Sequence, residues 1–131
     1  MNIALMAHDG KKELMVQFCI AYCGILAQHS ICATSTTGRL VAEATGLPIT
    51  LYLNASQGGS QQVAARIAYN EIDLVLFFRD LAEDDSDVNL ISRLCDQHNV
   101  PFASNVATAE VLIQGLKRGD LAWRDIVNPK K

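Results

Sequence analysis

Five apolar runs, each followed by a polar loop and a helical pattern, constrain the fold of this chain more than any other feature. The runs cover residues 2–7, 31–33, 49–53, 74–78 and 100–103. Apolar runs that alternate with helices are typical of strands buried on both faces of a parallel sheet. Right-handed crossovers connect such βα units. The sequence therefore predicts an α/β fold with a five-stranded parallel sheet.

The helical patterns between these runs are less sharply bounded. Spacing of apolar residues predicts a long helix over residues 11–28, with Asp9 as its cap, and a short helix over residues 40–45. Gly115 and Gly119 are expected to break the last long helix. We expect Trp123 and Ile126, in the C-terminal segment, to dock on the body of the domain.

Composition bounds the class of protein. Half of the 131 residues are hydrophobic and the net charge is −3, so residues 1–131 can form one domain with a real core. The charge gives no reason to expect nucleic acid or an acidic membrane as partner. No apolar run reaches the roughly 20 residues of a membrane helix. The chain enters a strand pattern at once, so we expect no signal peptide.

The four cysteines lie within apolar patterns. Cys19 and Cys23 are four residues apart on an expected helix, and Cys32 and Cys95 lie in or beside other apolar stretches. Such thiols are more typical of buried, reduced cysteines than of disulfides or zinc ligands. We therefore expect a cytoplasmic protein without a metal site.

A run of hydroxyl residues follows the second apolar run. Small donors and backbone N–H groups at a helix N-terminus can hold a phosphate, and a glycine there lets the backbone approach closely. A plain helix cap with a polar turn is the alternative, for which Thr37 alone would suffice. The stretch is no Walker loop, because no Gly-Lys-Ser/Thr sequence ends it. The candidate phosphate ligands are Thr34, Ser35, Thr36, Thr37 and Gly38.

The end of the first predicted strand also carries groups that could act on a ligand. His8 and Asp9 follow the first run, and Lys12 comes one turn later. His8 could bond a substrate oxygen, Asp9 could orient it or move a proton, and Lys12 could hold a phosphate. Alternatively, the three residues are a structural histidine, a capping aspartate and a surface lysine. Ligands of open α/β sheets bind at the carboxyl ends of the strands.

The loops after the third and fourth runs are also polar. Gly58 and Gly59 allow close backbone approach, and Ser60 is expected to be the N-cap of the next helix. These residues could form a ligand wall or simply a loop and a cap. Most acids of residues 79–87 fit a solvated loop, but Asp80 and Asp87 could point into the site.

These stretches in register resemble the methylglyoxal synthase family. The resemblance covers residues 2 to about 113. Its motifs are, in chain order, Ala7-His8-Asp9 with Lys12, Ala33 to Gly38, Gly58 to Val63, Ile72 to Phe78 with Asp80, and Ser104 to Ala109. It implies a three-layer αβα fold, a homohexamer, and a reaction without metal or organic cofactor. In that reaction dihydroxyacetone phosphate loses a proton from its hydroxymethyl carbon, then phosphate, and becomes methylglyoxal.

The resemblance also implies roles for single residues. Lys12 and residues 34–38 would hold the phosphate, with Asn54 and Ala55 standing where the family has a Ser-Gly pair that lines the substrate. His8 would polarise the substrate oxygens. Asp9, Asp80 and Asp87 match site carboxylates, and Arg93 matches a charged neighbour. The partners are then a small phosphorylated substrate and inorganic phosphate.

One departure concerns the base. The family has an aspartate, its catalytic base, where this chain has Ser60. A serine hydroxyl takes no proton at neutral pH without help. The acidic loop is also shorter than the family's and lacks its histidine, and the C-terminal region has no clear match to a late arginine.

Three hypotheses follow. The chain could be a divergent synthase that uses Asp9 or Asp87 as base. It could be a non-catalytic phosphate-ligand sensor, since the same fold serves as a regulatory domain in carbamoyl phosphate synthetase. It could also be an engineered variant at position 60. The first is the function that we expect.

Overall fold

The computed structural model describes residues 1–128, which contain one sheet of five parallel strands. The strand order is β3-β2-β1-β4-β5. The predicted parallel sheet is confirmed, although its two edge strands are each two residues shorter than the apolar runs. The strands are β1 (Asn2–Ala7), β2 (Ser30–Ala33), β3 (Ile49–Leu51), β4 (Leu74–Phe78) and β5 (Phe102–Ala103).

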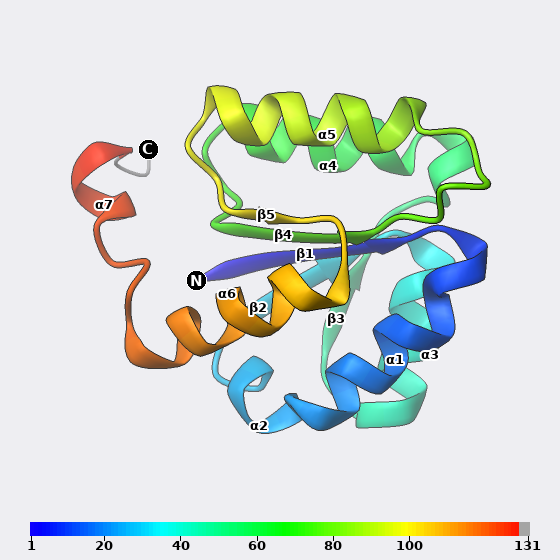
Figure 1. Ribbon diagram of the computed structural model, residues 1–131, viewed down its shortest axis with the longest axis horizontal. Coiled ribbons are helices and arrows are strands. Elements are labelled where there is room, and N and C mark those ends of the chain that lie inside the picture. Colours follow the sequence, from blue (N-terminus) through cyan, green and yellow to red (C-terminus); the bar gives the residue numbers. More distant parts are fainter. Residues whose placement is uncertain (129–131) are drawn as a thin grey trace.

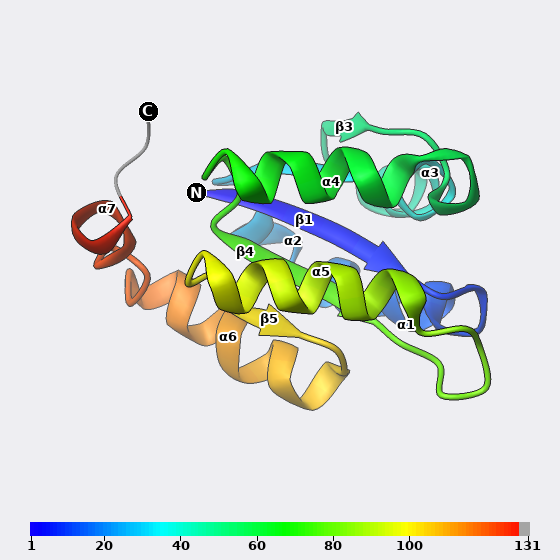
Figure 2. The ribbon, with the colours of Figure 1, turned by 90° about the horizontal axis from the view of Figure 1, so that it is seen from above.

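Helices cover both faces of the sheet and make three layers (Figures 1 and 2). Helices α4 and α5 lie on one face, and α1, α3 and α6 lie on the other. The helices are α1 (Lys12–Ala21), α2 (Cys23–Leu26), α3 (Ser35–Thr45), α4 (Gly59–Ala68), α5 (Ser86–Gln97), α6 (Val106–Arg118) and α7 (Arg124–Val127), with 3-10 turns η1 (Asp9–Lys11) and η2 (Ala55–Gln57). None of the helices in this described part is long and apolar enough to span a membrane.

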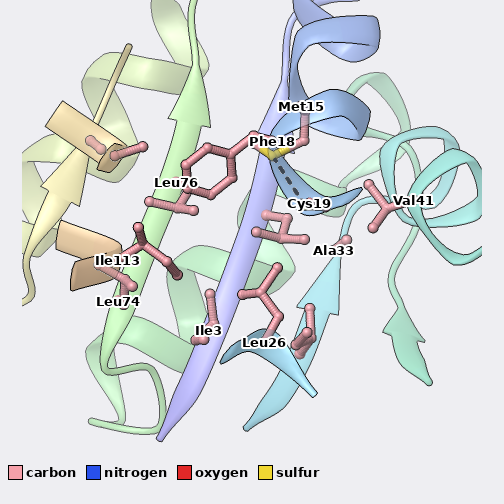
Figure 3. Close-up of a cluster of buried hydrophobic side chains, with 14 of the residues drawn as sticks. Ile3, Met15, Phe18, Cys19, Leu26, Ala33, Val41, Leu74, Leu76 and Ile113 are labelled. Carbon is pink, nitrogen blue, oxygen red and sulfur yellow. Dashed lines mark hydrogen bonds between the residues drawn. The ribbon is translucent and has the colours of Figure 1, made fainter. Parts of the chain in front are cut away.

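The alternation of side chains along β1 divides the core into two layers. Ile3 and Leu5 pack toward α1, α3 and α6, together with Phe18 and Ile113 (Figure 3). The intervening Ala4 and its neighbours on the other face pack against α4 and α5. Because both faces are covered, every residue of β4 is buried, which explains why its run is apolar without alternation.

Several predicted helix boundaries are wrong. The helix expected over residues 11–28 is divided at Tyr22, whose ψ of 22° leaves the helical range, two residues before the weak helix former Gly24. Asp9 does not cap it, because its carboxylate bonds Lys12 instead. Gly115 lies within α6, which ends at Gly119 with a φ of 80°.

The C-terminal segment docks differently from the expectation. Trp123 is 42% exposed and Ile126 is 83% exposed, whereas Arg124 between them is buried. Helix α7 lies at the end of the sheet where β1 begins (Figure 1). Arg124 donates there to main-chain and side-chain oxygens around the starts of β4 and β5. The segment is therefore anchored by Arg124, and not by Trp123 and Ile126 as expected.

The topology fixes where a ligand should bind. Sequence order along the sheet reverses between β1 and β4, which are neighbours in the sheet although β2 and β3 lie between them in the sequence. In open α/β sheets, ligands bind outside the carboxyl ends of the strands at such a switch point. The loops that follow β1 and β4 are therefore the first place to look for a site.

Candidate active site

A cavity of about 530 Å³ opens at the carboxyl ends of β1, β2 and β3 and reaches the loop after β4. It brings together nine of the predicted site residues: His8, Asp9, Lys12, Thr34, Thr36, Thr37, Asn54, Ala55 and Asp87. Ala7, Ser56, Glu83 and Asp84 complete its lining. Ser35, Gly38, Gly58, Gly59, Ser60 and Asp80 are not among the lining residues. Four loops distant in sequence thus meet in one polar cleft.

The orientation of His8 is set by the loop after β4. Its Nδ1 accepts a hydrogen bond from the backbone N–H of Asp80 at 2.8 Å. A backbone N–H can only donate, so the neutral imidazole carries its proton on Nε2. The ring also packs edge-on against Phe77, with the ring centres 5.3 Å apart. His8 can therefore donate from Nε2 to a ligand oxygen.

Lys12 is held at the floor of the cavity. Its Nζ donates to the Ala7 carbonyl at 2.7 Å and lies 2.9 Å from the Asp9 carboxylate. An ammonium has three N–H groups, so these two acceptors leave one for a ligand. The hydrogen bond from Lys12, and then its charge, lower the pKa of Asp9. Asp9 is thereby held ionised and engaged by a cation.

The hydroxyl run forms the first turn of α3 rather than a loop before a helix. The N-cap is Thr34, not Thr37, and the Thr34 side chain makes no capping hydrogen bond. The Thr37 Oγ1 is buried and has no hydrogen-bond partner among the described residues. Thr36 donates from both its backbone N–H and its hydroxyl to Asn54 Oδ1. The N-terminus of an 11-residue helix therefore faces the cavity with hydroxyl donors beside it.

Two members of the run make other contacts. The Ser35 hydroxyl accepts a hydrogen bond from the Arg39 side chain at 3.1 Å. A Cβ on Gly38 would lie 2.4 Å from the Leu51 side chain and 3.0 Å from that of Ala33. Gly38 is thus needed for close packing of α3 on the strands, which is a structural requirement independent of any ligand.

Close packing also explains the glycines before α4. Gly58 has a φ of 105° and is the N-cap of α4, so the expectation that Ser60 caps this helix is wrong. A Cβ on Gly59 would lie 1.9 Å from the Leu53 carbonyl oxygen. Ser60 is fully buried, and its hydroxyl has no partner among residues 1–128. Ser60 is therefore buried in the protein and does not line the cavity.

The acidic loop contributes more side chains than its composition indicated. Glu83 lines the cavity and accepts from the Gly10 backbone at 3.2 Å, and Asp84 accepts from the backbone and hydroxyl of Ser86. The Ser86 hydroxyl, and then its N–H, lower the pKa of Asp84. Glu83 is half-buried, whereas Asp84 is exposed, as a solvated loop predicts. The signal for their place at the cavity is that they lie in the loop that follows a buried strand.

Asp80 and Asp87 occupy different places. Asp80 accepts from the Ala82 N–H and lines a neighbouring hollow with Lys11 and Arg79. Asp87 lines the cavity from the first turn of α5. The exposed Arg93, on the same helix, is not among the residues that line it. Within residues 1–128, no three His, Cys, Asp or Glu side chains converge in a way that could hold a metal ion.

Comparison with known proteins identifies the class of domain to which this chain belongs. The family model for the MGS-like domain matches residues 15–104. A crystal structure of methylglyoxal synthase from Elizabethkingia anophelis superposes with a TM-score of 0.79 at 37% identity, covering 86% of this chain and 76% of the other. The fold is therefore that of an MGS-like domain.

Curated relatives identify the protein family within this class of domain. Methylglyoxal synthase from Caldicellulosiruptor saccharolyticus is 59% identical over 99% of this chain and 94% of its own length. The enzyme from Geobacillus thermodenitrificans is 51% identical over 98% of this chain and 91% of its own length. The chain belongs to the methylglyoxal synthase family, which is a family of lyases. Identity at this level over nearly the whole chain favours an enzyme over the regulatory-domain alternative.

Proposed function

We propose that this cleft converts dihydroxyacetone phosphate to methylglyoxal and inorganic phosphate, with Asp87 as the base. The base removes a proton from the hydroxymethyl carbon, and the electron pair forms an enediolate. The enediolate then expels phosphate from the neighbouring carbon, and the resulting enol becomes methylglyoxal. This chemistry needs a base, donors at the carbonyl oxygen, and a grip on the phosphate.

The phosphate grip is supported by the donors gathered at the start of α3. Thr36, Thr37 and Lys12 all line the cavity, and the buried Thr37 hydroxyl has no partner among residues 1–128. A helix N-terminus and a lysine together favour a dianionic group. His8, with its proton on Nε2, supplies a donor for the carbonyl oxygen as the enediolate forms.

The assignment of Asp87 rests on how the other carboxylates are engaged. Asp9 is paired with Lys12, Glu83 accepts from Gly10, and Asp84 accepts two hydrogen bonds from Ser86. The contacts of Asp9 and Asp84 lower the pKa of these two carboxyls and make them weaker bases. Asp87 is half-buried in the cavity wall. Ser60 lies outside the lining and has no carboxylate to offer.

The test is methylglyoxal release from dihydroxyacetone phosphate. The unsubstituted enzyme should turn over, and Asp87→Asn should lower kcat by about 10²- to 10⁴-fold, the usual contribution of a general base. The matched control is Asp96→Asn, the same change on an exposed residue of α5. Loss of activity in Asp9→Asn but not in Asp87→Asn would transfer the role to Asp9. Phosphate binding without turnover in the unsubstituted chain would favour a ligand sensor.

We propose further that the protein is a cytoplasmic homohexamer in which residues 1–131 form one domain. The four cysteines are free thiols, and three are buried, which suits a reducing compartment. Leu51 and Leu53 are 42% and 50% exposed at the β3 edge of the sheet, where a second copy could cover them. Light scattering should give six times the chain mass of 14.3 kDa, whereas the monomer mass would contradict the assembly.

A further inference from the structure

The side chain of Asn54 occupies donors that a phosphate would need. Its Oδ1 accepts from the Thr36 backbone N–H at 3.1 Å and from the Thr36 hydroxyl at 2.7 Å. Because a backbone N–H cannot accept, the atom that faces it is the amide oxygen and not the nitrogen. Both residues line the cavity. The Asn54 side-chain oxygen is thus bound at the N-terminus of α3, where a phosphate oxygen would bind.

This contact substitutes for the usual helix cap. An N-cap side chain normally accepts from the second or third residue of its helix, and Thr36 is the second residue of α3. The actual N-cap, Thr34, makes no such bond, so the acceptor comes from the loop after β3. The main chain of Asn54 is fixed separately, because its carbonyl accepts from Gln57 and Gly59, each at 2.9 Å. The carboxamide can therefore turn away while the loop stays in place.

We propose that the Asn54 carboxamide competes with the phosphate group for the Thr36 donors and so weakens phosphate binding. The proposal rests on the proposed function, in which the substrate phosphate binds at the start of α3. A phosphate oxygen and Asn54 Oδ1 cannot accept from the same two donors in the same place. The side chain must turn out when phosphate binds, and its return favours release of the phosphate product. Asn54 then lowers the affinity of the site for phosphate and is not a phosphate ligand.

Calorimetric titration with inorganic phosphate tests this competition. Asn54→Ala removes the competing oxygen and should tighten phosphate binding by about 5- to 50-fold, the equivalent of two ordinary hydrogen bonds. Asn54→Ser, whose side chain ends one bond short of the amide oxygen, should act in the same direction. In a Thr36→Val background the hydroxyl is gone, so Asn54→Ala should tighten binding by much less.

A matched control separates competition from loss of a cap. Asn105 caps α6 by accepting from the Thr108 N–H at 2.9 Å, outside the cavity lining. Asn105→Ala should lower stability as Asn54→Ala does, but leave the phosphate affinity unchanged. Weaker phosphate binding in both Asn54 variants would overturn the proposal and make Asn54 a direct ligand. If neither the unsubstituted chain nor any variant binds phosphate, the proposed function itself fails.

Discussion

At the scale of single residues, Ser60 separates two accounts of the chemistry. If a base were missing from this chain, Ser60→Asp would restore about 10²- to 10⁴-fold in kcat. Because Ser60 lies outside the cavity lining and Asp87 is already in it, we expect a rise of less than about tenfold. Steady-state release of methylglyoxal at pH 7 measures this. A rise above about 100-fold would contradict Asp87 as the base.

The same substitution should affect stability. The Ser60 hydroxyl is fully buried and has no partner among the described residues, so an ionised carboxyl introduced there should lower the free energy of unfolding by about 1–3 kcal/mol or more. Burial raises the pKa of such a carboxyl above its unfolded value, so the variant is most stable at acid pH and loses stability as the pH rises. Urea unfolding at two pH values shows this, and Ser60→Ala, which only removes the hydroxyl, should be near neutral.

The ion pair of Asp9 and Lys12 should stabilise the protein at neutral pH and lose this effect in acid, unlike a carboxyl at position 60. Lys12 lowers the pKa of Asp9 from its ordinary value of 3.8. The stabilisation is therefore present above that value and is lost as the pH falls through the folded-state pKa. In Lys12→Met, the pKa of Asp9 should return toward the ordinary value. Carbon-detected NMR titration of the carboxyl measures it, and an unchanged pKa would mean that the pair does not form in solution.

At the scale of elements, one buried arginine fixes α7 to the sheet. Arg124 is 1% exposed and donates to the Ile72 carbonyl at 3.1 Å and to the Asn70 side chain at 3.2 Å. Removing one member of a buried, charged network typically lowers stability by about 3–5 kcal/mol, because the partners lose their donors. Arg124→Ala should do so in urea unfolding. Arg124→Lys should recover little, because an ammonium lacks the planar fork.

Another arginine of the same region is a matched control. Arg118 pairs with Asp120 at 2.9 Å, but its side chain is 63% exposed. Exposed pairs contribute about 0–1 kcal/mol, so Arg118→Ala should change the free energy of unfolding by less than that. Equal effects of Arg118→Ala and Arg124→Ala on the free energy of unfolding would show that the buried contacts of Arg124 do not stabilise the protein.

The elements also show what a sequence can predict. Strands β1 and β4 have the predicted bounds, because their apolar runs are buried on both faces and end at polar residues. Edge strand β3 is shorter than its run because its partner strand β2 ends at Ala33, which pairs with Leu51. The start of α3 was placed five residues late, because consecutive hydroxyl residues favour loops unless a helix N-terminus takes them up.

The candidate site also has features that the sequence predicts and features that it does not. That His8, Thr36 and Asn54 share a cleft follows from topology, since parallel strands end at one edge. The direction in which each side chain points does not follow. The Asp80 N–H binds His8 while Asp80 is not among the residues that line the cavity, and Gly58, not Ser60, is the N-cap of α4. Both depend on contacts between loops that no local pattern contains.

At the scale of the whole molecule, the cysteines report on how the two core layers open. Burial raises the pKa of Cys19 and of Cys95 to about 12, and these residues lie in the layers on opposite faces of the sheet. Thiolates are the reactive form, so both should resist a thiol reagent until the fold opens. The half-buried Cys23, which donates to the Thr45 carbonyl, should react first.

Because strands β1 and β4 contribute side chains to both layers, neither layer can open alone without exposing the other face of the same strands. We therefore expect Cys19 and Cys95 to be labelled at the same rate across a urea series, with a rate that follows global unfolding. Mass spectrometry of labelled peptides resolves the sites, and Cys23→Ala should remove the fast phase without altering the slow one. Labelling of Cys95 well before Cys19 would show that the α4–α5 layer separates from the sheet independently, against the shared-strand argument.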